Sequence, residues 1–178
     1  MNLPNKLTLL RILLVPAYLL LLWFSPENPL LGTAALVVFV VASLTDLADG
    51  KIARKYNLVT NFGKFMDPIA DKLLTHTAFI MLTAMGRLNV WACIIFIARE
   101  FVVSGLRLVA VEQGRVIAAG MSGKIKTVLQ MAAVLGLNLV GAGVTWVNPL
   151  AQVIVWAAAA MTLVSMAEYV WQNRAVLE

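Results

Sequence analysis

Apolar residues occupy six long stretches of the chain, and polar residues gather in the short connections between them. The stretches lie at roughly Leu7–Phe24, Leu30–Arg54, Asp67–Met85, Val90–Val111, Gly123–Val140 and Leu150–Trp171. Each approaches or exceeds the ~20 residues that an α-helix needs to cross the hydrocarbon core of a bilayer. Because the connections are short, consecutive helices should be antiparallel neighbours. The pattern predicts an all-α integral membrane protein built as a bundle of six transmembrane helices.

The composition supports a membrane location. Of the 178 residues, 61% are hydrophobic and only 13% are charged, which is too apolar for a soluble domain of this length. We expect one transmembrane domain over residues 1–178. A single cysteine, Cys93, allows no internal disulfide, and its apolar neighbours indicate a packing role.

Lysines and arginines are concentrated at one end of the predicted helices. They lie near the N-terminus, around the second and fourth connections and near the C-terminus. The odd-numbered connections hold only Arg87, and Arg99 lies inside a span. The positive-inside rule therefore places both termini and the even-numbered connections in the cytoplasm. This topology, with attraction to anionic lipid headgroups, explains the net charge of +5 without a nucleic-acid partner.

Four aspartates lie at matching depths on the second and third predicted helices. Asp46 follows Leu30 by 16 residues, which is about 24 Å along a helix, and Asp71 comes out at about 22 Å when the third span is followed inward from Gly86. Asp49 is three residues from Asp46 and Asp67 is four from Asp71, so each pair shares a helix face. We expect all four carboxylates to face one another just inside the cytoplasmic boundary.

Such a cluster is unfavourable without positive charge, because carboxylates are costly within a membrane and repel one another. Four oxygen ligands without a nearby cysteine or histidine suit hard cations such as Mg²⁺ or Mn²⁺ and not zinc. Two ions held by shared carboxylates are a common arrangement for phosphoryl transfer. Two alternatives remain open: a salt-bridge cluster with the surrounding lysines and arginines, and an ion or proton pathway.

Small residues accompany the aspartates. Gly50 follows Asp49, Gly63 precedes Asp67 by four residues, and Ala53 and Arg54 lie one turn beyond Gly50. Glycine within a helix is unfavourable, and its usual advantage is close approach of a ligand or another helix. We expect a groove with small walls that accepts a nucleotide or phosphate, with close helix packing as the alternative explanation.

The arrangement Asp46-x-x-Asp49-Gly50-x-x-Ala53-Arg54, followed by Gly63-x-x-x-Asp67-x-x-x-Asp71, resembles the signature of the CDP-alcohol phosphotransferase family at all eight fixed positions. The resemblance implies six spans, a cytoplasmic active site, a homodimer, and transfer of a phosphatidyl or phospho-alcohol group from a CDP-linked donor with release of CMP. It also implies two divalent metal ions on Asp46, Asp49, Asp67 and Asp71, with Asp71 as general base. The implied CDP-binding residues are Asp49, Gly50, Ala53, Arg54, Gly63 and Asp67.

Four further stretches, "NLPNKLTLLR", "MDPIADK", "AREFVVSGLR" and "GKIKTVLQ", are similar to bacterial members of the family that use CDP-diacylglycerol as donor and glycerol 3-phosphate as acceptor. This resemblance implies phospholipid synthesis in the bacterial inner membrane. A family member that uses phosphatidylglycerol as acceptor, and so makes cardiolipin, is the near alternative. An ion-coupled membrane transporter is the alternative of a different class.

Basic residues at the depth of the aspartates favour an anionic acceptor. Arg107 ends the fourth span and Lys124 opens the fifth; together with Arg99 or Lys126 they can hold a phosphate dianion by charge-assisted hydrogen bonds. The alternatives are positive-inside anchoring for Arg107, Lys124 and Lys126, and pairing with Glu100 for Arg99. We expect His76 to be neutral and hydrogen-bonded inside the bundle. The role of Glu168, an inter-helix or a dimer contact, stays open.

Overall fold

The structure is a computed structural model that describes residues 3–55, 61–115, 117–118 and 120–176. Within these ranges, the side chains of 3–5, 46–55, 61–65, 67–68, 71 and 175 are not described. The described residues form helices and connections, without a β-strand. The helices are α1 (Leu3–Trp23), α2 (Pro29–Lys55), α3 (Asn61–Ala84), α4 (Val90–Glu112), α5 (Met121–Gly141) and α6 (Asn148–Gln172), with two short 3₁₀ helices, η1 (Thr145–Val147) and η2 (Arg174–Val176).

Each apolar stretch of the sequence corresponds to one α-helix, so the prediction of an all-α chain is confirmed. The helices extend beyond some apolar stretches, and α3 begins at Asn61, six residues before the predicted Asp67. The difference arises because the helical hydrogen-bond ladder continues into polar sequence, where hydropathy no longer marks it.

Glycines end two of the helices in the left-handed conformation that other residues rarely adopt. Gly86 follows α3 with φ 69°, and the N–H of Arg87 then donates to the carbonyl of Leu82 at 2.9 Å. Gly114 follows α4 with φ 71°, and the N–H of Arg115 donates to the carbonyl of Ala110 at 2.8 Å. Both are helix-ending turns that satisfy carbonyls at the helix end and allow the chain to reverse.

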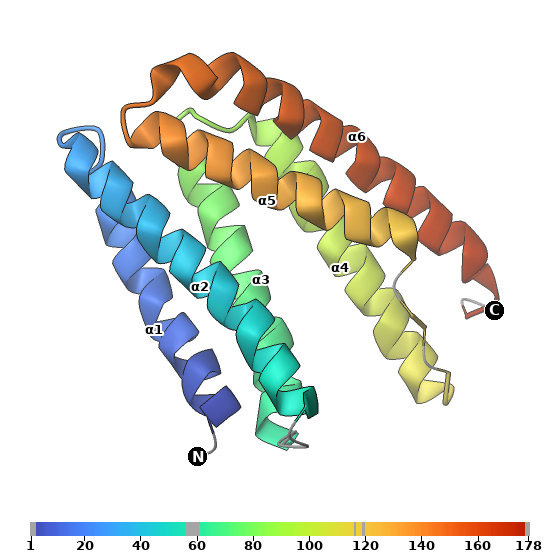
Figure 1. Ribbon diagram of the computed structural model, residues 1–178. Helices are drawn as coiled ribbons and strands as arrows, with labels where there is room; N and C mark the ends of the chain where they lie inside the picture. The colour runs from blue at the N-terminus through green and yellow to red at the C-terminus, as the bar shows by residue number, and fades with distance from the viewer. Residues whose placement is uncertain (1–2, 56–60, 116, 119, 177–178) are drawn as a thin grey trace.

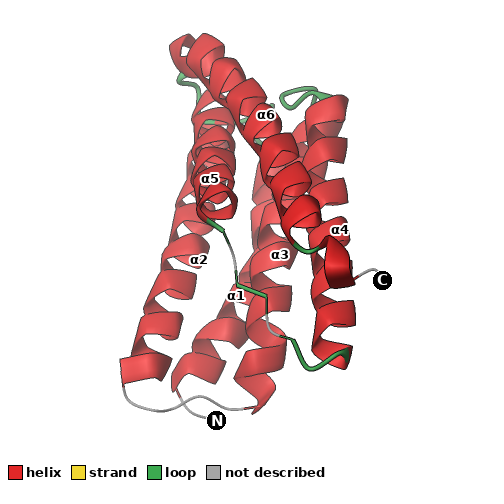
Figure 2. Ribbon diagram, turned by 90° about the vertical axis from the view of Figure 1, so that its right-hand side faces the viewer, coloured by secondary structure: helices red, strands yellow, loops and turns green. Residues whose placement is uncertain are grey.

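The helices form two groups (Figure 1). In the first group α1 packs against α2 and α3, and in the second α6 packs against α5 and α4. Contact between α2 and α5 joins the groups, whereas α3 makes few contacts with α4 or α5. Both views place the N-terminal end of α1, the last turns of α2 and the first turns of α3 at one end of the bundle (Figure 2). The motif-bearing ends of α2 and α3 therefore lie at the same end.

Apolar side chains cover much of the outer surface. Leu13, Leu20, Leu30 and Trp146 are each more than 60% exposed, and many other large apolar residues are also exposed. An apolar surface of this extent is unfavourable in water and favourable in lipid. Among the described residues, Lys6–Trp23 and Thr145–Gln172 are each long and apolar enough to cross a membrane. These features indicate a membrane protein.

Arg11, one of the basic residues near the N-terminus, does not lie at the surface. Its side chain is fully buried between α1 and α2, and its Nε donates to the carbonyl of Ala42 at 3.3 Å. The positive-inside rule predicts the depth of a charge along the helix but not the direction in which the side chain points. Arg11 therefore contributes to helix packing.

A close approach of backbones joins α2 to α5. A Cβ atom added at Gly32 would overlap the carbonyl oxygen of Gly141, and a Cβ added at Gly141 would overlap the guanidinium of Arg87. The carbonyl of Gly141 is backbone and cannot move aside, whereas the guanidinium of Arg87 ends a flexible side chain and can shift. The contact that links the two helix groups therefore requires Gly32.

We predict that Gly32→Ala destabilises the protein by about 1–3 kcal/mol, because the added methyl group must separate α2 from α5. For a chain of this size, that change lowers the Tm in detergent by about 2–12 °C. Gly105→Ala in α4 is the matched control, since a Cβ at that position meets nothing within 4 Å. Equal Tm values for Gly32→Ala and the unmodified protein would contradict the proposed role of this contact.

Candidate active site

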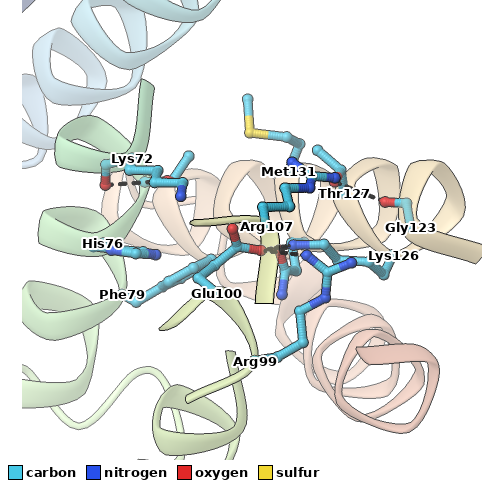
Figure 3. A pocket seen from close by; sticks show the side chains of 12 residues that line it. Lys72, His76, Phe79, Arg99, Glu100, Arg107, Gly123, Lys126, Thr127 and Met131 are labelled. Atoms are coloured by element: carbon cyan, nitrogen blue, oxygen red, sulfur yellow. Dashed lines mark hydrogen bonds and ion pairs between the residues drawn. The ribbon is translucent and has the colours of Figure 1, made fainter. Parts of the chain in front are cut away.

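A polar cavity of about 300 Å³ lies where α3 faces α4 and α5 (Figure 3). It exists because α3 packs mainly against α1 and leaves space beside α4 and α5. Among the described side chains, the charged lining consists of four cations and one carboxylate: Lys72, Arg99, Arg107, Lys126 and Glu100. The other lining residues are Thr75, His76, Phe79, Gly123, Thr127, Gln130 and Met131.

The α3 wall is formed by one helix face. Lys72, His76 and Phe79 recur at helical spacing and point toward the cavity (Figure 3). Lys72 Nζ donates to Ser104 Oγ of α4 at 2.6 Å, which connects the two sides of the cavity. The ring of Phe79 packs against Phe96, with centroids 4.9 Å apart, and gives the site an apolar boundary toward the core.

Glu100 of α4 is the centre of the ionic contacts. Its carboxylate accepts a hydrogen bond from Arg99 Nη1 at 3.0 Å and another from Lys126 Nζ. Lys126 Nζ also donates to Gln130 Oε1 at 3.2 Å. Arg99 and Lys126 are only 6% and 4% exposed, so both charges require these partners. One carboxylate thus balances part of a larger positive charge.

Hydrogen-bond donors remain available for an anionic ligand. The buried Nε of Arg99 has no hydrogen-bond partner within the described part of the chain. Arg107 is exposed, and its Nε donates to Tyr169 Oη at 3.1 Å. The remaining guanidinium donors together with Lys72 make the cavity suited to a phosphate group, which binds such donors by charge-assisted hydrogen bonds.

Three of the four residues predicted to bind the acceptor phosphate line this cavity: Arg99, Arg107 and Lys126. The Arg99–Glu100 pairing that the sequence left as an alternative is present as well. Lys124 is exposed and is not among the lining residues, so its predicted role stays a prediction. His76 is half-buried and lines the cavity, and its predicted neutral, hydrogen-bonded state stays a prediction.

The aspartate motif lies on helical segments whose side chains are outside the described residues. Asp46, Asp49, Gly50, Ala53 and Arg54 fall near the end of α2. Gly63, Asp67 and Asp71 fall near the start of α3. The described side chains contain no group of three or more histidine, cysteine, aspartate or glutamate residues that could hold a metal ion. All four predicted metal ligands lie outside the described side chains.

The backbone nevertheless relates the motif to the cavity. Asp71 directly precedes Lys72, a lining residue, on the same helix. The cavity therefore borders the turn of α3 that carries Asp71. The α3 wall of the cavity runs from Lys72 to Phe79, about 10 Å along the helix, and its near end lies directly beside Asp71.

Sequence reasoning missed two contributors to the site. The sequence pattern gives Lys72 a role in topology or in a salt bridge to the aspartates, and it does not single out Gln130. A signal was present for each: Lys72 follows Asp71 on a predicted inward-facing helix, and Gln130 is a polar residue four positions after Lys126 within an apolar stretch. Polar residues within a span more often mark a site than lipid-facing surface.

Comparison with known proteins gives consistent results. Residues 1–164 match the CDP-alcohol phosphatidyltransferase family. The chain is 45% identical to the CDP-diacylglycerol–glycerol-3-phosphate 3-phosphatidyltransferase of Bacillus subtilis, covering 97% of this chain and 95% of that protein. The protein of that name from Rickettsia typhi is 42% identical, covering 94% of each chain.

A probable phosphatidylglycerophosphate synthase of Mycobacterium tuberculosis is 40% identical, covering 95% of this chain and 80% of that protein. The family match covers most of the chain and includes the segment with all eight motif residues. This chain therefore belongs to the CDP-alcohol phosphatidyltransferase family.

Proposed function

We propose that this protein transfers the phosphatidyl group of CDP-diacylglycerol to glycerol 3-phosphate, giving phosphatidylglycerophosphate and CMP in phospholipid biosynthesis. The observation that carries the proposal is the cationic cavity that borders the aspartate motif on α3. The relatives from Bacillus subtilis and Rickettsia typhi, which are similar over nearly the whole chain, bear the name of this activity. Family membership favours a transferase over an ion-coupled transporter.

The cavity favours glycerol 3-phosphate over phosphatidylglycerol as acceptor. Four cationic side chains against one carboxylate suit the dianionic phosphate monoester of a small acceptor. The phosphodiester of phosphatidylglycerol carries a single negative charge, and its acyl chains would need an apolar path beside the cations. The charge of the site therefore distinguishes the two members of the family.

We assign the donor to the motif at the ends of α2 and α3. In this proposal Asp49, Gly50, Ala53, Arg54, Gly63 and Asp67 bind the CDP group. The oxygen-only donor set of Asp46, Asp49, Asp67 and Asp71 suits two divalent ions, Mg²⁺ or Mn²⁺. Such ions, when bound, neutralise the pyrophosphate and the departing CMP.

Asp71 acts as general base in the proposed reaction. It accepts the proton of the C1 hydroxyl of glycerol 3-phosphate while that oxygen bonds to the phosphorus of the phosphatidyl group. The bond from this phosphorus to the CMP oxygen breaks, and CMP leaves. Arg99, Arg107 and Lys126 hold the phosphate of the acceptor, so their contribution is to position its hydroxyl beside Asp71.

We also propose the setting of the reaction. Residues 1–178 form one catalytic domain with six membrane spans in the bacterial inner membrane, and the protein works as a homodimer. Both termini and the active site face the cytoplasm, where water-soluble glycerol 3-phosphate can enter. The uneven distribution of basic residues and the apolar surfaces of the helices support this arrangement.

The proposed reaction predicts that purified protein in detergent releases CMP from CDP-diacylglycerol and Mg²⁺ when glycerol 3-phosphate is added. Phosphatidylglycerol and glycerol serve as alternative acceptors in parallel reactions. CMP release with phosphatidylglycerol alone would mean a cardiolipin-forming enzyme. Absence of CMP with every alcohol would exclude the transferase proposal.

We predict that chelation of divalent ions abolishes CMP release and that added Mg²⁺ or Mn²⁺ restores it. Asp71→Asn should lower kcat at least about 100-fold at saturating metal, since it removes the proposed base. The variant's Tm in detergent, measured alongside, separates loss of chemistry from loss of folding. Activity that persists fully in the chelator would contradict the metal assignment.

Lys126→Gln should raise the KM for glycerol 3-phosphate by about 10- to 100-fold, because it removes a charge-assisted hydrogen bond to the acceptor. The KM for CDP-diacylglycerol should stay within about twofold of the unmodified value, given that the donor binds elsewhere. Lys6→Gln is the control, since Lys6 is exposed on α1. Lys124→Gln, measured beside them, decides whether that exposed lysine contributes. An unchanged KM in Lys126→Gln would place the acceptor outside the cavity.

A further inference from the structure

The buried face of α6 changes character along its length. Six of its seven buried positions recur at alternating spacings of four and three residues, the repeat of a packed helix seam: Ala151, Val155, Ala158, Thr162, Ser165 and Tyr169. The seventh, Ala159, lies beside this seam. In the first half the seam is apolar and packs beside α5, where a Cβ at Gly136 would lie 3.0 Å from Ala151 Cβ. In the second half every seam residue carries a hydroxyl group. The change occurs at the level of the cationic cavity.

Each of the three hydroxyl groups contacts a residue of the cavity lining. Thr162 Oγ1 accepts from Gln130 Nε2 at 3.1 Å, and Ser165 Oγ accepts from Arg99 Nη2 at 3.1 Å. Tyr169 Oη accepts from Arg107 Nε at 3.1 Å, and the Arg107 guanidinium lies 5.6 Å from the centre of the same ring. None of the three α6 residues lines the cavity itself.

Thr162 determines the orientation of Gln130. Its hydroxyl donates to the carbonyl of Ala158 at 2.6 Å, so toward Gln130 it acts as an acceptor and selects the amide nitrogen. The amide oxygen of Gln130 then faces Lys126 Nζ at 3.2 Å. A reversed amide would present N–H groups to the ammonium group, which cannot accept them. The hydroxyl therefore fixes the position of Lys126 through Gln130.

Ser165 holds Arg99 in a gap left by a glycine. A Cβ at Gly123 of α5 would lie 3.3 Å from Arg99 Nη2 and 3.8 Å from Ser165 Oγ, so a larger residue would crowd the guanidinium. Ser165 on one side and Glu100 on the other determine the plane of that group. An alanine seam would pack equally well in a bundle core, yet it would leave these donors without acceptors.

We propose that Thr162, Ser165 and Tyr169 are positioning residues for the acceptor phosphate: α6 holds Lys126, Arg99 and Arg107 in the geometry that binds it. The inference rests on the proposed function and adds a helix that touches neither substrate. Because rigid donors lose less conformational entropy on binding than mobile ones, this second layer determines affinity for the acceptor.

The test is a set of variants that remove single hydroxyl groups: Thr162→Val, Ser165→Ala and Tyr169→Phe. Each should raise the KM for glycerol 3-phosphate by about 5- to 30-fold, the effect of one lost hydrogen bond within the site. The KM for CDP-diacylglycerol should stay within about twofold. Thr162→Ser, which keeps the hydroxyl, should restore the KM for glycerol 3-phosphate.

Thr83→Val is the matched control. Thr83 of α3 also donates to a carbonyl of its own helix, that of Phe79 at 2.7 Å, but it is not among the cavity-lining residues. Its removal should leave both KM values unchanged. If Thr162→Val lowers Tm strongly, Tyr169→Phe near the end of α6 still tests the inference, since a ring of the same shape remains in place.

A double-mutant cycle tests whether Thr162 acts through Gln130. In a Gln130→Ala background, Thr162→Val should raise the KM for glycerol 3-phosphate less than twofold further, because the group that it orients is already absent. If the effects of Thr162→Val and Gln130→Ala on this KM are fully additive, Thr162 does not act through Gln130. If the unmodified protein is active and all three hydroxyl variants keep its KM values, the inference fails while the proposed function stands. Unmodified protein that is inactive with glycerol 3-phosphate but active with phosphatidylglycerol would overturn the proposed function and this inference together.

Discussion

The placement of Glu100 is the constraint on which the cavity depends. Arg99 and Lys126 are both nearly inaccessible, and a buried cation without a partner would be strongly destabilising. Glu100 contacts both, so one carboxylate stabilises two buried charges while the cavity lining remains positive. A second carboxylate would lower the positive charge of the lining further, and without any carboxylate the two buried cations would lose their ionic partner. This balance allows a stable bundle to keep a positively charged cavity.

The two groups of helices carry different parts of the candidate site. The group of α1, α2 and α3 carries the aspartate motif near the end of α2 and the start of α3, whereas α4 and α5 supply most of the cationic lining. The glycine contact between α2 and α5 fixes one group against the other. In the proposed function this contact holds donor and acceptor sites together, so the reacting atoms meet through packing of helices rather than through a flexible loop.

The sequence predicts well how deep a residue lies along its helix, and poorly in which direction its side chain points around that helix. The residues of this protein show the difference. Hydropathy located all six helices. The depth argument brings Arg107 and Lys124 to the level of the aspartates, and the cavity contains Arg107 together with Arg99 and Lys126, the two residues offered as its partners. Lys124 and Lys126 are about 200° apart around a helix, so they cannot face the same way. Both lie near the polar start of α5, where hydropathy does not indicate which of the two faces the cavity. The same distinction applies to Arg11, since charge near a terminus indicates a membrane boundary but does not reveal burial between α1 and α2.

The role of the α6 hydroxyl groups could not be predicted from the sequence. Threonine, serine and tyrosine in an apolar span are unremarkable singly, because hydroxyls can bond to their own helix and face lipid at little cost. Their meaning comes from recurrence on the seam positions of α6, and the seam is known only when the partner helices are placed. If the cations of α4 and α5 bind the acceptor, then α6 is where acceptor affinity can change without loss of a charge. Substitutions along this seam would adjust the site gradually, whereas loss of Arg99 or Lys126 would leave Glu100 with fewer partners and remove the ligand's own contacts at once.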